Sequence, residues 1–181
     1  MMTVYLSHGL ESGPDALKIQ ALKGIAEKLD DCEPVVMDYR GMAEPSKRLE
    51  HLLVTLAKRN DKPSECVLAG SSLGGWLSAA ASAQHPVLGC FLLAPALGLP
   101  AYPQTSPTIQ ARLTHIIHGW QDDVVLPGPV IEHAQRQHLS LRMVDDDHRL
   151  HASLDTILSD FEHFLVQCQT LDQQAIQAGY P

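Results

Sequence analysis

Six short apolar runs recur along the chain, and each is bounded by polar or turn-forming residues. Short runs rich in Val, Ile and Leu indicate strands, and runs without polar interruption indicate strands that are buried on both faces. The last run alternates apolar and polar positions, as suits an exposed edge strand. The predicted strands are Thr3–Ser7, Pro34–Tyr39, Glu65–Gly70, Val87–Ala94, Leu113–His118 and Leu139–Asp145.

Between these runs, apolar residues recur with the spacing 0, +3, +4 and +7 of an amphipathic helix. Strands and helices alternate throughout this pattern, so we expect a parallel sheet that is covered by helices on both faces. The repeating sets are Leu22, Ile25, Ala26 and Leu29, then Leu49, Leu52, Leu53 and Leu56, and finally Leu154, Ile157, Leu158 and Phe161.

The length and composition are those of one globular domain. The 181 residues are 45% hydrophobic and contain no biased tract, which allows one core and leaves no room for a second domain. We expect this domain to span residues 1–170, followed by a frayed tail over 171–181, where apolar periodicity is weak. The net charge of −8, without a Lys/Arg cluster, argues against nucleic acid or an anionic membrane as partner and favours a small molecule.

The chain shows no targeting or membrane-spanning segment. Residues 1–8 lack the basic and long apolar regions of a signal peptide, and no stretch approaches the ~20 apolar residues that span a bilayer. We therefore expect a cytoplasmic protein. The cysteines show no C-x-x-C spacing and are expected to be reduced and structural; they are Cys32, Cys66, Cys90 and Cys168.

The sequence Gly70-Ser71-Ser72-Leu73-Gly74 ends one apolar run and precedes an Ala-rich helical stretch. Such a G-x-S-x-G pentapeptide between a strand and a helix is typical of a nucleophile elbow. The serine occupies a strained turn, and the glycines let the strand and the helix approach closely. Ser72 is therefore the candidate nucleophile. A glycine-rich helix start with a capping serine remains the alternative.

Two later strands end in residues that could activate this serine. The strand at 113–118 is followed by Asp122, and the strand at 139–145 is followed by His148. A serine nucleophile needs a histidine as base and a carboxylate that orients the imidazole. The order Ser, Asp, His distinguishes one class of serine hydrolases from the others.

Three segments, 70–77, 118–125 and 147–150, resemble the signatures of the α/β-hydrolase superfamily, and in particular of its small lidless serine esterases and acyl thioesterases. They read Gly-Ser-Ser-Leu-Gly-Gly-Trp-Leu, His-Gly-Trp-Gln-Asp-Asp-Val-Val and Asp-His-Arg-Leu. One departure is Leu126, which stands before Pro127 where the family usually has proline at once, and it shifts the start of the next helix by one residue.

The resemblance implies a minimal α/β-hydrolase fold with about six parallel strands in the order 2-1-3-4-5-6 and no cap domain. The short, proline-rich segment 95–107 lies where larger relatives insert a cap, and it is expected to form only a rim.

The resemblance also implies hydrolysis of a small carboxylic ester or thioester, without cofactor or metal. His148 would accept the Ser72 proton and pass it to the leaving group, while Asp122 would orient the imidazole. The backbone N–H groups of Leu10 and Leu73 would bind the oxyanion.

Several alternatives stay open. His148 could be a solvated loop histidine, and Asp123 competes with Asp122. Asp147, His148 and His151 could together bind a metal. The whole chain could also be a non-catalytic α/β-hydrolase homologue that binds a small ligand.

Five apolar side chains are candidates for an acyl pocket, although the first could equally pack between helix and sheet: Trp76, Leu97, Leu99, Tyr102 and Trp120. The three aspartates at 145–147 are expected to repel anions from the entrance. We therefore expect neutral esters with short to medium acyl chains to be preferred.

Overall fold

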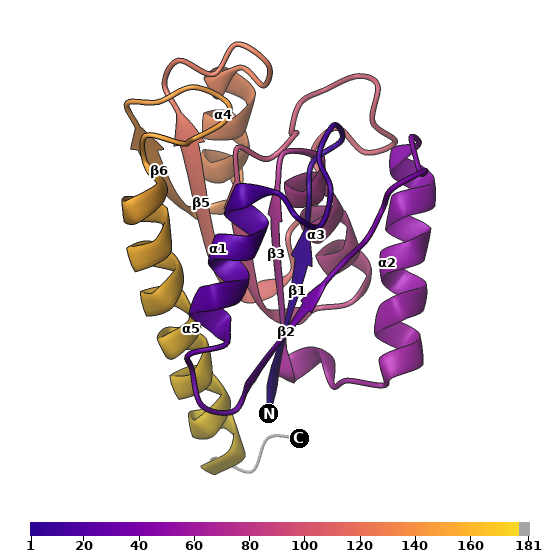
Figure 1. Ribbon diagram of the computed structural model, residues 1–181, viewed down its shortest axis with the longest axis vertical. Coiled ribbons are helices and arrows are strands. Elements are labelled where there is room, and N and C mark those ends of the chain that lie inside the picture. The colour runs from indigo at the N-terminus through magenta and orange to yellow at the C-terminus, as the bar shows by residue number, and fades with distance from the viewer. Residues whose placement is uncertain (178–181) are drawn as a thin grey trace.

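In the computed structural model, which describes residues 1–177, six parallel strands form one sheet in the order β2-β1-β3-β4-β5-β6 (Figure 1). This confirms the predicted parallel sheet and its order. The strands are β1 Met2–Ser7, β2 Cys32–Val36, β3 Cys66–Ser71, β4 Val87–Leu93, β5 Ala111–Gly119 and β6 Ser140–Val144. The helices are α1 Leu17–Ala26, α2 Pro45–Arg59, α3 Leu73–Gln84, α4 Pro127–Gln137 and α5 Leu154–Gln177, with a short 3₁₀ helix, η1, at Pro63–Glu65.

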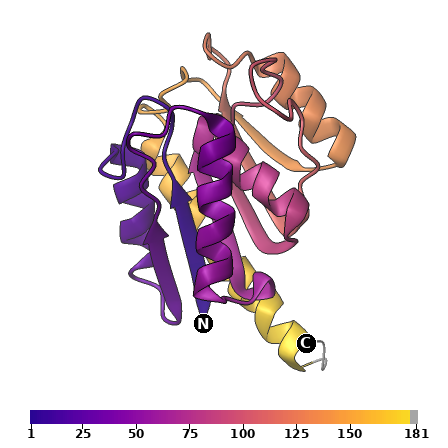
Figure 2. The ribbon, with the colours of Figure 1, turned by 90° about the vertical axis from the view of Figure 1, so that its right-hand side faces the viewer.

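The helices cover both faces of the sheet (Figures 1 and 2). Alternate side chains of β1 divide between the two faces, because successive residues of a strand point to opposite sides. Val4 and Leu6 belong to the apolar cluster under α1 and α5, whereas Tyr5 belongs to the cluster under α2, α3 and α4. Two buried layers therefore hold the central strands rigidly in place.

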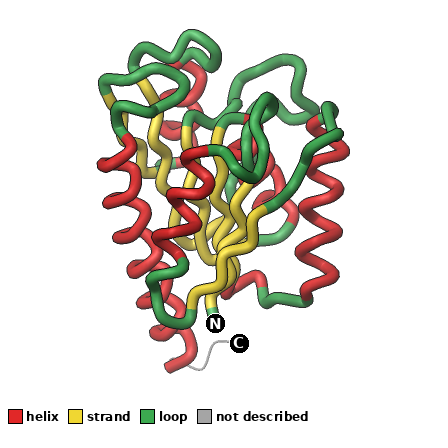
Figure 3. Tube along the Cα trace, viewed as in Figure 1, coloured by secondary structure: helices red, strands yellow, loops and turns green. Residues whose placement is uncertain are grey.

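One prediction about the order of the elements is wrong. No helix lies between β4 and β5, so strands and helices do not alternate throughout. The connection, residues 94–110, carries four prolines, and a proline lacks the N–H that a helix interior needs. It forms a loop that leaves the carboxyl edge of the sheet, among the green segments at the top of Figure 3, and returns to the amino end of β5.

The C-terminal helix also extends beyond its predicted end. The expected tail from Leu171 is helical as far as Gln177, and residues 178–181 lie outside the described part of the chain. Leu171 packs against the apolar cluster under α5, and the Gln169 side chain donates to the Asp30 carbonyl at 2.7 Å. These contacts hold the helix to the domain although its apolar pattern is weak.

The four cysteines are free, and burial raises the pKa of the Cys66, Cys90 and Cys168 thiols to about 12. None of these three thiols is therefore available as a thiolate nucleophile. In the described part of the chain, no helix combines the length and the apolar character that a membrane crossing requires.

The topology of the sheet brings the candidate site residues to the carboxyl ends of the strands. β1 lies between β2 and β3, so the connections from β1 and β3 leave the sheet in opposite directions. In open sheets of parallel strands, ligands bind in the crevice that this divergence opens at the carboxyl ends. Ser72, Asp122 and His148 all follow strands at this edge.

Candidate active site

Ser72 occupies the turn between β3 and α3 in a strained conformation, with φ +56° and ψ −115°. The turn is tight because the strand and the helix touch. A Cβ atom on Gly70 would lie 2.2 Å from the Gly74 carbonyl oxygen, and one on Gly74 would lie 2.0 Å from the Ser7 carbonyl oxygen. Only glycine fits at these two positions, which accounts for the G-x-S-x-G spacing.

This strain gives a stability prediction. Ser72→Gly is expected to be more stable than Ser72→Ala by about 1 kcal/mol. Relief of roughly 1–3 kcal/mol of backbone strain outweighs the ~0.5–1 kcal/mol entropic cost of a glycine. Urea unfolding of the two variants measures the difference directly, and both lack the hydroxyl. An equal or lower free energy of unfolding for Ser72→Gly would show that the turn is unstrained.

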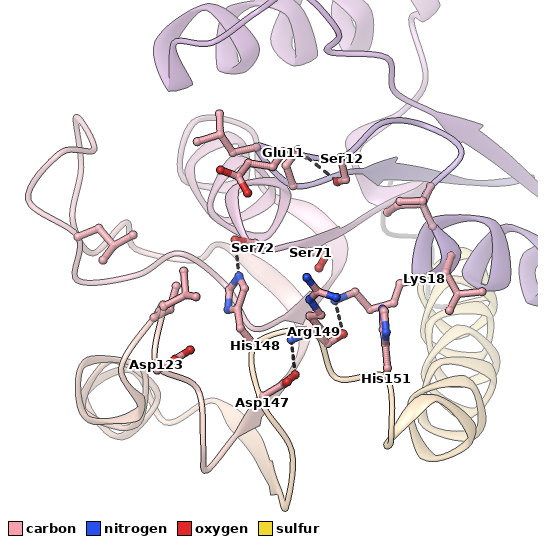
Figure 4. Close-up of a pocket in the computed structure, with 18 of the residues that line it drawn as sticks. Glu11, Ser12, Lys18, Ser71, Ser72, Asp123, Asp147, His148, Arg149 and His151 are labelled. Atoms are coloured by element: carbon pink, nitrogen blue, oxygen red, sulfur yellow. Dashed lines mark hydrogen bonds between the residues drawn. The ribbon is translucent and has the colours of Figure 1, made fainter.

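Three side chains converge at the Ser72 hydroxyl. His148 Nε2 lies 3.0 Å from Ser72 Oγ, and His148 Nδ1 lies 2.7 Å from Asp122 Oδ2. A carboxylate only accepts hydrogen bonds, so Nδ1 carries the proton and Nε2 is free to accept from the serine. Figure 4 shows the His148 ring directed at Ser72.

The Asp122 carboxylate is buried and held on both oxygens. Oδ1 accepts the backbone N–H groups of Val124 and Val125 at 3.0 and 2.8 Å, while Oδ2 faces His148. Asp123 is exposed and lies at the cavity wall. Of the two candidate aspartates, the structure therefore brings Asp122 to the histidine.

His118 supports the turn that carries Asp122. Its Nε2 donates to the Val125 carbonyl at 2.9 Å and lies 3.4 Å from Asp122 Oδ2. Burial lowers the pKa of His118, and among the described residues its Nδ1 has no hydrogen-bond partner. A neutral His118 does not compensate the negative charge of Asp122. His148, at 2.7 Å, is also closer to the Asp122 carboxylate than His118 is.

Arg48 is a residue that the sequence analysis missed. It is only 3% exposed, and its guanidinium leaves α2 to donate to the carbonyl oxygens of Gly9 at 3.0 Å, Leu10 at 3.1 Å and Met42 at 2.6 Å. His8 also donates to the Gly9 carbonyl, at 2.8 Å. Carbonyl and N–H point in opposite directions across a trans peptide, so the Leu10 N–H points away from Arg48.

One sequence signal could have revealed Arg48. It precedes Leu52 by four residues, which places a cation on the buried face of the amphipathic helix. A buried guanidinium requires acceptors, and the loop after β1 supplies them.

A cavity of about 690 Å³ opens over Ser72. Two of the five candidate pocket residues, Leu99 and Tyr102, line it. The other three do not. Trp76 and Leu97 are buried in the core, where the Trp76 indole donates to the Gln104 carbonyl at 2.6 Å, and Trp120 is 55% exposed outside the cavity. Periodicity cannot tell a core-facing Trp from a pocket-facing one.

The three aspartates before His148 have different partners. Asp145 accepts from the Gln121 side chain at 2.6 Å, and Asp146 accepts the N–H of Ser153 just before α5 at 2.8 Å. Only Asp147 lines the cavity, and it accepts the N–H of Arg149 at 2.8 Å. Asp145 and Asp146 therefore lie outside the cavity lining, and the repulsion of anions at the entrance stays a prediction.

No metal site forms within residues 1–177. No three His, Cys, Asp or Glu side chains of this region are placed to hold a metal ion, and this includes Asp147, His148 and His151.

The strand order, the strained serine turn and the position of the site at the carboxyl edge define a member of the α/β-hydrolase superfamily. The chain belongs to the uncharacterised protein family UPF0227, whose model matches residues 2–134. This match includes Ser72 and Asp122 and ends before His148.

Solved structures agree with this assignment. A protein of the alpha/beta hydrolase superfamily from Xanthomonas campestris pv. campestris is 32% identical, with a TM-score of 0.81 over 92% of this chain and 99% of that one. Alpha/beta hydrolase domain-containing protein 10 from mouse is 18% identical, with a TM-score of 0.77 over 91% and 90%. Est1E from Butyrivibrio proteoclasticus is 18% identical, with a TM-score of 0.74 over 93% and 88%. No curated protein matches the sequence.

Proposed function

We propose that this protein is a serine hydrolase that cleaves small carboxylic esters or thioesters through an acyl-enzyme on Ser72. The observation that carries the proposal is the hydrogen-bonded line from Ser72 Oγ through His148 to Asp122, which opens onto the cavity. Membership of the α/β-hydrolase superfamily supports hydrolysis as the reaction class.

In the proposed first step, Ser72 Oγ attacks the acyl carbon while His148 Nε2 takes its proton. The Asp122 carboxylate stabilises the imidazolium that forms, because it lies 2.7 Å from Nδ1. His148 then gives the proton to the departing alcohol or thiol, and the acyl group remains on Ser72. Water, activated by the same histidine, releases the acid in the second step.

The proposed oxyanion donors are the N–H groups of Leu73 and Leu10. Leu73 is the first residue of α3, and a helix leaves its first amides without intrahelical acceptors. The partial positive charge of the helix N-terminus adds to this donor. The Leu10 N–H lies opposite the carbonyl that Arg48 holds. One such donor typically contributes about 2.7–4 kcal/mol to the transition state.

A series of 4-nitrophenyl esters from acetate to decanoate, with matched acyl thioesters, tests this proposal. The wild type is expected to turn over the short and medium members, and Ser72→Ala is expected to lose this turnover. A wild-type rate no higher than that of Ser72→Ala on every ester and thioester would contradict hydrolysis and favour a ligand-binding role. The relative rates on paired oxygen esters and thioesters identify the preferred leaving group.

A further inference from the structure

Two cations line the same cavity as Ser72 and have no part in the proposed proton transfer. Lys18 lies in the first turn of α1, and Arg149 directly follows His148. The Lys18 ammonium donates to the Arg149 carbonyl at 2.6 Å, which brings the two residues together. Figure 4 shows both residues, with Ser71 and Ser72, around this cavity.

Neither cation forms a direct ion pair with a carboxylate of the described residues. Within residues 1–177, no carboxylate oxygen lies within 4 Å of the Lys18 ammonium or the Arg149 guanidinium, although other cations of the chain form such pairs. The chain has 21 acidic and 13 Lys and Arg residues, so carboxylates are not scarce. Two neighbouring like charges repel, and a bound anion would remove this cost.

The Lys18 ammonium is partly desolvated in the cavity wall. Burial in the cavity wall lowers the pKa of its ammonium to about 8, and Arg149 acts in the same direction. Asp146, Asp147 and Asp122 act in the opposite direction but do not compensate for burial. The Lys18 ammonium has three N–H donors, and one of them bonds to the Arg149 carbonyl. The others can donate to a bound anion, which would favour the charged form of the ammonium.

The two cations of the cavity lie on the same side of Ser72. In Figure 4, Lys18, Arg149 and His151 lie on one side of Ser72 and His148, whereas Asp123 lies on the other. Two further carboxylates line the cavity: Glu11, on the loop after β1, and Asp147, which accepts the Arg149 N–H and acts electrostatically on Lys18. An anion beside Lys18 and Arg149 would therefore meet two cations next to the nucleophile.

We propose that the substrate is an ester or thioester that carries a carboxylate, which binds Lys18 and Arg149 while its acyl carbon lies at Ser72. This inference rests on the hydrolase function proposed above and names its substrate class. A guanidinium fork and an ammonium are matched to carboxylate oxygens and give charge-assisted hydrogen bonds. It replaces the expectation from the sequence that neutral esters are preferred.

Two matched substrate pairs test the inference. The first pair, mono-4-nitrophenyl adipate and 4-nitrophenyl hexanoate, places the carboxylate on the acyl side. The second, 4-carboxyphenyl butyrate and its methyl ester, places it on the leaving group. The wild type is expected to favour the carboxylate member of one pair by about tenfold or more in kcat/KM, and this preference should fall as salt is added.

Variants assign the preference to the two cations. Lys18→Gln keeps a group that can donate to the Arg149 carbonyl, and Arg149→Gln keeps the backbone contacts of the turn. Each is expected to lower kcat/KM about tenfold on the favoured carboxylate substrate and less than about twofold on its neutral partner. Arg149→Lys should retain most of the preference. Lys28→Gln, two residues beyond the C-terminal end of α1, removes one charge as a control and should leave the preference unchanged.

The outcomes separate this inference from the hydrolase proposal. Hydrolysis of the neutral esters without preference for either carboxylate would overturn the inference and leave the hydrolase proposal standing. Equal losses on charged and neutral substrates in both variants would also overturn it, because the residues would then act on the site as a whole. No turnover of any of the four substrates would overturn both.

Discussion

Asp122→Asn is expected to lower kcat about 10,000-fold while the protein stays folded. The asparagine oxygen can still accept the N–H groups of Val124 and Val125, which now hold Asp122 Oδ1 at 3.0 and 2.8 Å. Its amide group would face His148 Nδ1 as a donor and force the imidazole proton onto Nε2. An Nε2 that carries a proton cannot accept one from Ser72. Steady-state kinetics on 4-nitrophenyl butyrate, at saturating substrate, measure this loss.

Asp123→Asn is the matched control. Asp123 is the neighbouring residue, carries the same charge and lines the cavity, but its side chain is exposed and has no place in the line to Ser72. Its kcat is expected to stay within about twofold of the wild type, as for a surface charge. A large loss in Asp123→Asn and a small one in Asp122→Asn would show that the wrong aspartate has been assigned.

Arg48→Met is expected to lower kcat about 100- to 1,000-fold, the effect of losing one oxyanion donor. The Arg48 guanidinium holds the carbonyls of Gly9 and Leu10 at 3.0 and 3.1 Å. Without it, the Gly9 carbonyl keeps only its side-chain contact with His8 at 2.8 Å, and the Leu10 N–H is held less firmly in its direction. This donor acts on the transition state, so the loss is expected in kcat and much less in KM.

Leu10→Ala is the control for this variant, because it removes a side chain from the same loop and keeps the N–H. Its kcat is expected to change little. Arg48 is buried, so its variant must be compared with the wild type at a urea concentration and temperature where both are folded. A folded Arg48→Met enzyme with an unchanged kcat would restrict Arg48 to a structural role.

The sequence predicts most of the sheet because each strand is a local apolar run. It predicts poorly that no helix separates β4 from β5. The loop between them contains apolar residues, and only the spacing of its prolines excludes a helix. The end of α5 depends on a contact between Gln169 and Asp30, which are distant in the chain. Long-range contacts of this kind leave no local pattern.

In the candidate site, too, some residues can be predicted from the sequence and others cannot. Parallel strands end at one edge, so residues that follow β3, β5 and β6 can be predicted to meet, and the structure brings Ser72, Asp122 and His148 together. Arg48 and Lys18 lie on helices, and only the packing of these helices on the sheet brings them to the site. Spacing along the chain can mark Arg48 as a cation on the buried face of its helix, but it does not predict which loop Arg48 contacts or that Lys18 lines the cavity.

A second set of serine, histidine and aspartate side chains in the same protein provides an internal control for the assignment of Ser72 as the nucleophile. On the outer part of the sheet, Ser140 Oγ lies 3.0 Å from His115 Nδ1, and His115 Nε2 lies 3.2 Å from Asp160 Oδ2. Ser140 is exposed on the edge strand β6 and lies outside the cavity that contains Ser72. We therefore expect Ser140 to be inactive, although it contacts the same types of side chain as Ser72.

Labelling with a fluorophosphonate, followed by mass-spectrometric mapping of the modified residue, tests the account most directly. The reagent should form one adduct with the wild type, on Ser72, and this adduct should persist in Ser140→Ala and disappear in Ser72→Ala. A folded wild type that resists the reagent, or an adduct that remains in Ser72→Ala, would contradict the assignment of Ser72 as an activated nucleophile.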